Sequence, residues 1–297
     1  MARILISGGS GLIGRALLQS LRASGYQVSQ LVRQHPASAD ELPWDPERPL
    51  PPETVSSFDA VIHLAGESVA GRWTSAKKQR IEQSRVVGTA HLAQALAHAA
   101  QRPRVLISAS ATGYYGNRGD EILTEDSLPG EGFLPEVCKK WEAAAQPAGD
   151  AGIRTVRIRT GMVLSANGGA LKKMLPAFRM GVGGKIGNGC QWMSWISLED
   201  LTGAIQHILA TDSIAGAVNL TSPNPVTNAG FTRVLASVLH RPAIFPLPAL
   251  AVRLMFGEMG EELLLAGARV EPAKLLAGGY SFRHSDLRKT LEEILRT

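Results

Sequence analysis

A glycine-rich turn near the start of the chain constrains the fold more than any other feature. The segment Ser7–Gly14 (Ser-Gly-Gly-Ser-Gly-Leu-Ile-Gly) follows the apolar stretch Ile4–Ile6, and leucines then recur at 12, 17, 18 and 21. Such a pattern predicts a short buried strand, a tight turn and the N-terminus of an amphipathic helix. The segment is therefore expected to start an alternating α/β fold.

Each glycine of this turn has a physical role. Gly8 and Gly9 allow the chain to leave the strand sharply, because glycine adopts backbone conformations that other residues avoid. Gly11 lacks the Cβ that would block a pyrophosphate, and Gly14 lets the helix pack close to the sheet. Free N–H groups and the positive end of the helix dipole favour phosphate binding there. The turn thus predicts a Rossmann-type dinucleotide site, with a purely structural turn as the alternative; its residues are Gly8, Gly9, Ser10, Gly11, Leu12, Ile13 and Gly14.

Strand and helix patterns alternate through the first half of the chain. Apolar runs predict strands at 27–32, 59–64, 104–108 and 154–158, and helical periodicity covers about 75–100 and 133–145. Alternation of this kind is typical of a doubly wound parallel sheet covered by helices. We expect a Rossmann domain over 1–165, joined by about 190–222, and a smaller lobe over 166–297 in which 246–297 is a short helical domain.

Other elements are less regular. The proline-rich segment 36–52 is expected to be an irregular loop. A strand is expected over 193–196, a helix beginning at Glu199-Asp200, and a short strand over 218–220. Ser285 is expected to cap the last helix, over 286–295.

Composition narrows the class of protein. The 297 residues are 44% hydrophobic and 19% charged, with a net charge of +5, which is ordinary for a soluble globular chain. Two cysteines, Cys138 and Cys190, form no disulfide framework or metal-ligand spacing, so we expect no metal site and a cytoplasmic location. No apolar run approaches the ~20 residues of a membrane span, which argues against a membrane partner. Scattered basic residues without aromatic partners argue against nucleic acid.

The end of the second predicted strand bears on the choice of dinucleotide. NAD-binding domains usually carry Asp or Glu there, to accept hydrogen bonds from the ribose 2′-hydroxyl. This chain instead continues Arg33-Gln34-His35, with no carboxylate before Asp40. A guanidinium suits a 2′-phosphate, so the sequence favours NADP(H) over NAD(H). The alternative is that Arg33 is simply a solvent-exposed arginine at the end of a strand.

Several segments together resemble the extended short-chain dehydrogenases/reductases. More closely, the chain is similar to their YfcH-like "epimerase family" branch, which has a short helical C-terminal domain. The resemblance spans essentially the whole chain. It is carried by Gly8–Gly14, His63–Glu67, Arg72-Trp73, Ser84-Arg85, Ser108–Gly116, Arg159–Leu164, Met174–Arg179, Trp195–Leu201 and Gly279–Phe282.

The resemblance implies further site residues. Leu64 and Ala65 would line the adenosine half of the cofactor, Arg85 would contact NADP, and Val163 would lie near the nicotinamide. Ser110 falls where these proteins place an active-site serine or threonine. Gly66, Glu67 and Ser108 belong to the same cofactor-side motifs, and for Glu67 a hydrogen bond to the cofactor ribose or a structural one is expected.

The usual catalytic pair of this group is absent. Its members carry Tyr-x-x-x-Lys on the helix after the serine strand, as acid/base and its lysine partner. Aligning Glu142 with the acidic residue that commonly follows the motif puts Leu134 and Cys138 in the two positions. Neither can play these parts. Tyr114 or Tyr115 could supply the acid/base instead, although one ring packed under the loop and one exposed is the plainer interpretation.

Two functions remain open from the sequence. The first is an NADP(H)-dependent oxidoreductase or epimerase-like enzyme acting on a carbonyl, hydroxyl or nucleotide-sugar type small molecule, with Ser110 polarising the substrate oxygen. An anionic substrate group is one interpretation of the basic residues of the second half, and separate solvated side chains are an equal one. The second function is a dinucleotide-binding sensor or scaffold without turnover, because the resemblance includes relatives linked to cell or organelle division. The oligomeric state stays open.

Overall fold

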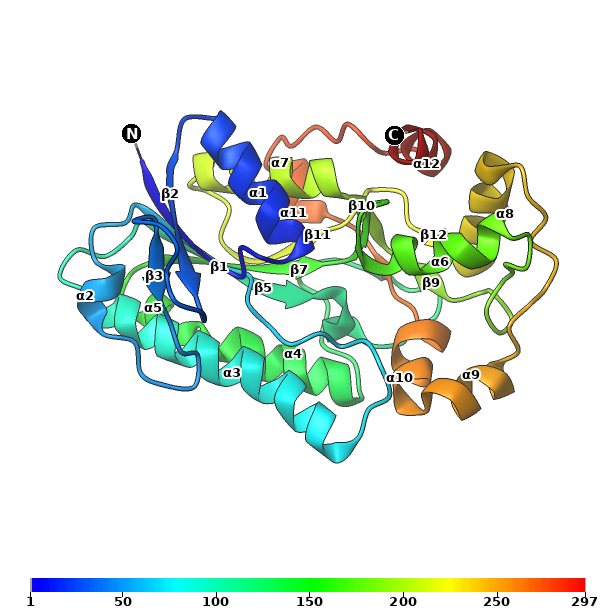
Figure 1. Ribbon diagram of the computed structural model, residues 1–297, viewed down its shortest axis with the longest axis horizontal. Helices are drawn as coiled ribbons and strands as arrows, with labels where there is room; N and C mark the ends of the chain where they lie inside the picture. Colours follow the sequence, from blue (N-terminus) through cyan, green and yellow to red (C-terminus); the bar gives the residue numbers. More distant parts are fainter. Residues whose placement is uncertain (1, 297) are drawn as a thin grey trace.

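The computed structural model describes residues 2–296, and a seven-stranded parallel sheet forms its centre (Figure 1). The strand order is β11-β7-β5-β4-β1-β2-β3. The strands are β1 (Arg3–Ser7), β2 (Gln27–Val32), β3 (Glu41–Pro43), β4 (Ala60–His63), β5 (Val105–Ala111), β7 (Arg154–Thr160) and β11 (Gly216–Leu220). The order reverses between β1 and β4, which is where such sheets bind ligands at their carboxyl edge.

Helices cover both faces of this sheet (Figure 1). On one face lie α1 (Leu12–Ala23) and α7 (Leu198–Ala210), and on the other α3 (Ser75–His98), α4 (Phe133–Ala144) and α5 (Gln146–Asp150). Central strands are buried on both faces, as the fully buried β4 illustrates. Two hydrophobic clusters, one on each face, hold the layers together. The predicted doubly wound α/β fold is confirmed.

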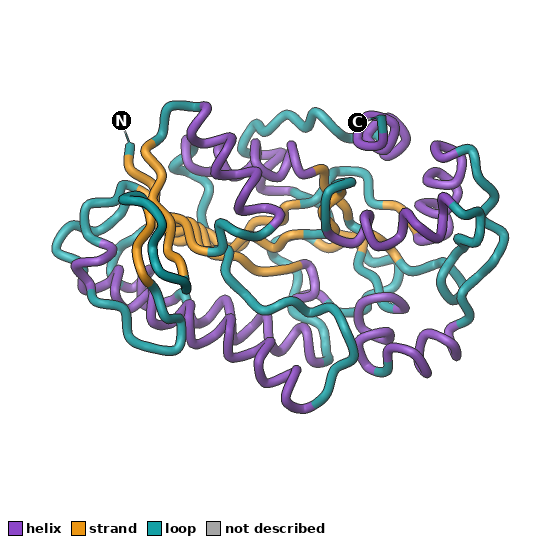
Figure 2. The backbone as a smooth tube through the Cα atoms, in the orientation of Figure 1, coloured by secondary structure: helices purple, strands orange, loops and turns teal. Residues whose placement is uncertain are grey.

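Much of the second half of the chain builds a smaller lobe at the end of the molecule where α6, α8 and α9 lie, at the right of Figure 1 and, in the same orientation, of Figure 2. Its own hydrophobic cluster is centred on Leu175, Trp195 and Phe231. Its elements are β8 (Met162–Leu164), α6 (Gly169–Arg179), β9 (Trp192–Met193), β10 (Trp195–Ser197), β12 (Val226–Thr227), α8 (Asn228–Leu239), α9 (Ala249–Phe256), α10 (Glu258–Gly260), η2 (Glu261–Leu265), β13 (Arg269–Val270) and α12 (Leu287–Leu295). The short helix α11 (Ala273–Ala277) packs on the main sheet at β11 instead. Strand β11, from within this half, returns to the main sheet beside β7.

Some sequence expectations were wrong in detail. The proline-rich segment contains an edge strand, β3, and a helical turn, α2 (Pro52–Val55). An edge tolerates Pro43, which has no N–H to donate. The strand expected over 193–196 is two short strands in different sheets, β9 and β10.

The C-terminal segment also differs in detail from expectation. It includes a short strand, β13, which pairs with β6 (Ile122–Leu123). The last helix is capped by Asp286 rather than Ser285, because the Asp286 carboxylate accepts a hydrogen bond from the Lys289 amide. None of the helices within residues 2–296 combines the length and the apolar character needed to cross a lipid bilayer. The predicted domain limits 1 and 297 lie outside the described residues.

Candidate functional site

The glycine turn follows β1 at the point where the strand order reverses. Gly8 has φ +76°, and a Cβ there would lie 2.7 Å from the carbonyl carbon of Leu64. A Cβ on Gly14 would lie 2.2 Å from the carbonyl oxygen of Gly8. Gly11 is exposed, and its Cβ would meet only that oxygen, at 3.4 Å. Gly8 and Gly14 are therefore required by the protein's own packing, whereas Gly11 keeps open the surface that a pyrophosphate would approach.

The ends of β4 and β8 lie next to this turn. Leu64 follows β4, its amide bonds to the Ser7 carbonyl at 3.1 Å, and it and Ala65 are half-buried beside Gly8. Val163, in β8, is half-buried and packs against the cluster on the α1 face. A Cβ on Gly169 would meet both the Val163 carbonyl oxygen and the Leu12 side chain. The fold thus brings these distant segments together around the glycine turn.

Arg33 lies directly after β2, at the edge of a surface cavity of about 470 Å³. The cavity is lined by Arg33, Gln34, His35, Pro36, Pro43, Trp44 and Asp45. Arg33 is exposed, and within residues 2–296 it forms no ion pair. Its position beside the β1 turn is where the ribose 2′-substituent of a dinucleotide belongs in this type of sheet.

A group of cations surrounds Glu67. The Lys77 ammonium donates to its carboxylate at 2.6 Å, and the Ser84 hydroxyl accepts from its backbone amide. The hydrogen bond to Lys77, together with the positive charges of Lys77, Arg80 and Arg33, holds the pKa of Glu67 below its ordinary value. Glu67 therefore already has a structural partner, one of the two roles expected for it.

Arg85 projects from α3 toward the same edge. Its guanidinium lies over the Trp141 ring at 5.0 Å and donates to the Ile81 carbonyl. A Cβ on Gly66 would be 3.4 Å from Arg85 Cζ. Burial lowers the pKa of Arg85, and within the described residues it has no carboxylate partner at salt-bridge distance. A half-buried unpaired cation at this edge fits contact with an anionic or polyhydroxylated ligand.

Two side chains of the expected cofactor-side motifs are buried instead. His63 contacts the Ser7 hydroxyl at 2.6 Å and the Thr89 hydroxyl at 2.9 Å, and burial lowers its pKa to about 4. His63 is therefore a core histidine with both ring nitrogens in contact with buried hydroxyls. Ser108 is 1% exposed, and its hydroxyl has no hydrogen-bond partner among the described residues, so its side chain lies below the surface that a ligand can reach.

The predicted catalytic serine belongs to a buried polar network. Ser110 donates to Glu142 Oε1 at 2.7 Å. The same carboxylate accepts from Arg159 Nε at 2.8 Å and from Arg159 Nη2 at 2.9 Å. The hydrogen of Ser110 is therefore already committed, and all three residues are at most 6% exposed. In this arrangement Ser110 cannot donate to a substrate oxygen, so the role given to it by resemblance is not supported.

The two tyrosines of the adjoining turn η1 (Thr112–Tyr115) have different environments. Tyr115 is fully buried, and its hydroxyl lies 2.7 Å from Asn219 Oδ1 and accepts from Arg159 Nη1. Burial raises its pKa to about 12, so it is a structural residue rather than the acid/base considered above. Tyr114 is half-buried, with its ring 3.5 Å from Arg159 Cζ. No hydrogen bond engages its hydroxyl within residues 2–296.

The positions of the missing catalytic pair are filled by buried side chains on one face of α4. Leu134 packs against Gly113, and the Cys138 thiol lies 3.9 Å from the Ala111 carbonyl oxygen. Burial raises the pKa of Cys138 to about 12. Neither side chain is suited to proton transfer at neutral pH, because Leu134 carries no ionisable group and the Cys138 thiol is buried with a raised pKa.

One contact at this position could not be expected from the sequence. The Glu262 carboxylate, from the C-terminal lobe, accepts hydrogen bonds from the amides of Phe133 and Leu134, both at 2.8 Å. It thereby satisfies the free N–H groups of the first turn of α4. Lys78 of α3 pairs with Glu258 nearby, at 2.7 Å. The C-terminal lobe is thus tied to both helices.

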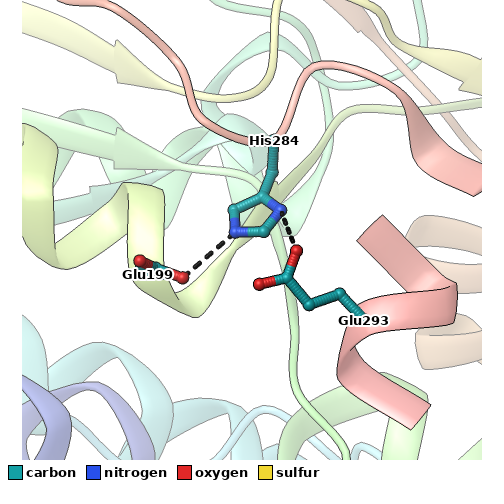
Figure 3. A group of neighbouring side chains, drawn as sticks. All are labelled: Glu199, His284 and Glu293. Carbon is teal, nitrogen blue, oxygen red and sulfur yellow. Dashed lines mark hydrogen bonds and ion pairs between the residues drawn. The ribbon is translucent and has the colours of Figure 1, made fainter. Parts of the chain in front are cut away.

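A cluster of Glu199, His284 and Glu293 lies where α7 meets the C-terminal segment (Figure 3). Nε2 of His284 is 3.1 Å from Glu199, and its Nδ1 is 3.9 Å from Glu293. Potential ligand atoms of the three lie within 4.8 Å of one another. Arg283 pairs with both carboxylates, so their charge already has a counterion. The cluster connects α7 to α12.

Family models match two parts of the chain. Residues 4–220 match the model described as "NAD dependent epimerase/dehydratase family". Residues 247–294 match "Domain of unknown function (DUF1731)", which corresponds to the segment predicted as a short helical domain. A protein of Mycobacterium bovis called "Epimerase family protein Mb2239" is 44% identical over 98% of this chain and 96% of its own length.

Two solved structures are similar over nearly the whole chain. The crystal structure of human epimerase family protein SDR39U1 (isoform 2) with NADPH superposes with a TM-score of 0.91, at 36% identity, over 99% of each chain. The nucleoside-diphosphate sugar epimerase from Corynebacterium glutamicum gives a TM-score of 0.82 at 38% identity, over 99% of this chain and 58% of that one. The likeness covers the sheet, the glycine turn and the C-terminal lobe.

Proposed function

Because the chain belongs to the NAD dependent epimerase/dehydratase family, we propose that it is an NADP(H)-binding oxidoreductase or epimerase-like enzyme acting on a small molecule. The substrate class would be a carbonyl, hydroxyl or nucleotide-sugar type compound. The cofactor would lie along the carboxyl edge of the sheet, with its pyrophosphate at the glycine turn.

The observation that carries the cofactor assignment is the unpaired Arg33 at the cavity beyond β2. A forked guanidinium matches a 2′-phosphate, and the residues directly after β2, Arg33-Gln34-His35, include no carboxylate to accept from a ribose hydroxyl. The carboxylate of the cavity lining, Asp45, follows β3 instead. The human relative crystallised with NADPH supports the same assignment, at 36% identity.

Residues of this chain would bind the two ends of the cofactor. Gly11 would leave room for the pyrophosphate, and Leu64 and Ala65 would contact the adenosine half. Arg85 would contact NADP(H), and Val163 would lie near the nicotinamide. NADP(H) supplies a hydride donor or acceptor when bound. Tyr114 is the remaining candidate for holding or moving a proton at the substrate oxygen, because its hydroxyl is not engaged by the protein.

Calorimetry with NADPH and NADH tests the cofactor assignment. Arg33→Ala is expected to weaken NADPH binding by ~1–3 kcal/mol and to leave NADH binding nearly unchanged. Arg102→Ala, an exposed arginine away from the cavity, serves as the charge-matched control and should change neither. Equal losses for the two dinucleotides in Arg33→Ala would refute the assignment.

A second function is favoured by the filled positions on α4. Leu134 and Cys138 stand where the family's tyrosine and lysine would be, and the raised pKa of Cys138 keeps its proton in place. A protein that binds the dinucleotide as a sensor or scaffold needs no such pair.

Turnover separates the two functions. A panel of carbonyl compounds and nucleotide sugars would be followed at the NADPH absorbance band, with product analysis for redox-neutral conversion. Substrate-dependent conversion that Tyr114→Phe abolishes, with NADPH binding intact, supports the enzyme. Tight NADPH binding without conversion across the panel supports the sensor.

A further inference from the structure

The outer end of the smaller lobe exposes an unusual number of large apolar side chains. Two loops run side by side there: the Lys185 carbonyl accepts from the Leu247 amide at 2.9 Å, and the Leu247 carbonyl accepts from the Gly187 amide at 2.9 Å. These loops and α9 form the right-hand end of the molecule in Figures 1 and 2. We call the following exposed side chains the apolar tip: Met180, Val182, Ile244, Phe245, Leu250 and Leu254, each between 51% and 71% exposed.

The helix α9 illustrates why this exposure calls for an explanation. Val252 faces inward and is fully buried, while Leu250 and Leu254, four residues apart, share the outer face and are 66% and 69% exposed. The inner apolar face of the helix therefore packs on the lobe, whereas its outer apolar face is not covered by any residue that the structure describes. Grouped exposed apolar side chains of this kind mark surfaces that meet a protein or a lipid.

The charge of the same lobe indicates what it meets. No Asp or Glu occurs between Asp150 and Glu199, or between Asp212 and Glu258. The exposed cations of these two stretches include Lys172, Lys173, Arg179, Lys185, Arg233 and Arg241, and none of these six forms an ion pair within residues 2–296. Arg241 Nε donates to the Arg179 carbonyl, which places these two arginines directly beside the loops of the tip. The partner must therefore be anionic and must also accept apolar side chains.

We propose that the apolar tip and the cations beside it, Arg179, Lys185 and Arg241, dock on an anionic phospholipid surface. Apolar side chains such as Phe245 would enter the boundary between headgroups and acyl chains, while Lys185 and Arg241 would meet lipid phosphates. A second copy of this chain fits less well, because two faces of the same positive sign repel each other. The sequence expectation of no membrane partner rested on the absence of an apolar run long enough to span a bilayer. Docking on the lipid surface needs no such run, so the proposal departs from that expectation without requiring a membrane span.

Docking at this end leaves the proposed cofactor site open. Arg33 directly follows β2, and the cavity is lined by residues that follow β2 and β3. These two strands lie at the left of Figure 1, opposite the end where α9 lies. The proposal is thus independent of turnover and of the cofactor assignment.

Co-sedimentation of the full chain with vesicles tests the docking. The vesicles contain phosphatidylcholine alone, or phosphatidylcholine with added phosphatidylglycerol. We expect binding to the anionic vesicles, little to the neutral ones, and loss of binding at high salt. Lys185→Gln with Arg241→Gln, and separately Phe245→Ser with Leu254→Ser, should each weaken binding by about tenfold or more.

Matched controls keep the result interpretable. Arg102→Gln with Lys139→Gln removes two exposed cations outside the lobe, and Leu128→Ser removes a leucine that is 75% exposed elsewhere. Neither should change vesicle binding, and all variants should retain the NADPH affinity of the parent chain. Absence of binding to anionic vesicles, or equal losses in the controls, would overturn the proposal. So would a dimer in light scattering that Phe245→Ser with Leu254→Ser converts to a monomer, because the tip would then cover a second copy.

Discussion

The carboxylate of Glu142 accepts two hydrogen bonds from the guanidinium of Arg159, of 2.8 and 2.9 Å, and both residues are buried. Burial by itself disfavours the charge of Arg159. The hydrogen bonds and the negative charge of Glu142 more than offset that effect, so the pKa of Arg159 lies above its ordinary value. The pair joins α4 to β7 beneath the turn that carries both tyrosines.

Removing one member of this pair should cost much stability. Glu142→Gln leaves the Arg159 charge buried without a counterion, and we expect the free energy of unfolding to fall by about 3–5 kcal/mol. Urea denaturation measures this loss. Glu136→Gln, on the same helix in an exposed pair with Lys139, should lose far less. Replacing both partners, Glu142→Leu with Arg159→Met, should lose less than Glu142→Gln alone, and a larger loss would contradict this account.

Two glycines of the first turn should respond in opposite ways. In Gly14→Ala the new Cβ would lie 2.2 Å from the Gly8 carbonyl oxygen, and overpacking of this kind costs about 1–3 kcal/mol of stability. In Gly11→Ala the nearest atom is 3.4 Å away, so the melting temperature should change little while NADPH binding weakens. Melting curves and calorimetry on both variants measure the two effects. A normally stable Gly14→Ala protein would disprove the close approach of α1 to the turn.

His63 should make the protein less stable in acid. Burial lowers its folded-state pKa to about 4, below the ordinary 6.5, so the unfolded chain binds the proton first as the pH falls. Stability that is fully present above pH 6.5 is therefore lost between about pH 6.5 and pH 4, by roughly 3 kcal/mol in total. Denaturation across this range should give a shallower pH dependence in His63→Gln than in the parent chain. His98→Gln, at an exposed histidine, should keep the parent slope.

The two cysteines should differ sharply in reactivity. Cys138 is 3% exposed, and burial raises its pKa to about 12, whereas Cys190 is exposed. Since the thiolate is the reactive form, native protein should react with a thiol reagent at Cys190 and not at Cys138. Urea should release the second thiol. Rapid labelling of Cys138 in the native chain would show that α4 opens at this position.

The fold was predictable because its signals are local. Glycine spacing in Ser7–Gly14 reports a turn that only glycine allows, and the periods of strand and helix repeat within each element. The order of strands in the sheet follows from these strand–helix–strand units, because the crossover between two parallel strands is nearly always right-handed. The position of Arg33 at the carboxyl edge of the sheet follows in the same way, because the carboxyl ends of parallel strands share one edge.

The chemistry of the site depended on contacts between distant segments. Ser110 lies in a serine-rich motif on β5, but its partner Glu142 is 32 residues away on α4, and only packing decides that the hydroxyl faces inward. Glu262 reaches the first turn of α4 from 128 residues beyond Leu134.

The amino-acid sequence by itself determined the doubly wound sheet, the glycine turn and the loss of the tyrosine–lysine pair. Each of these features can be recognised from residues that are close together in the sequence. Tertiary structure alone decided which hydroxyls stay available, Tyr114 rather than Ser110 or Tyr115, and gathered the exposed apolar and basic side chains at one end. The reason is physical: burial and partners are properties of surfaces that meet in space, and spacing along one segment does not encode them.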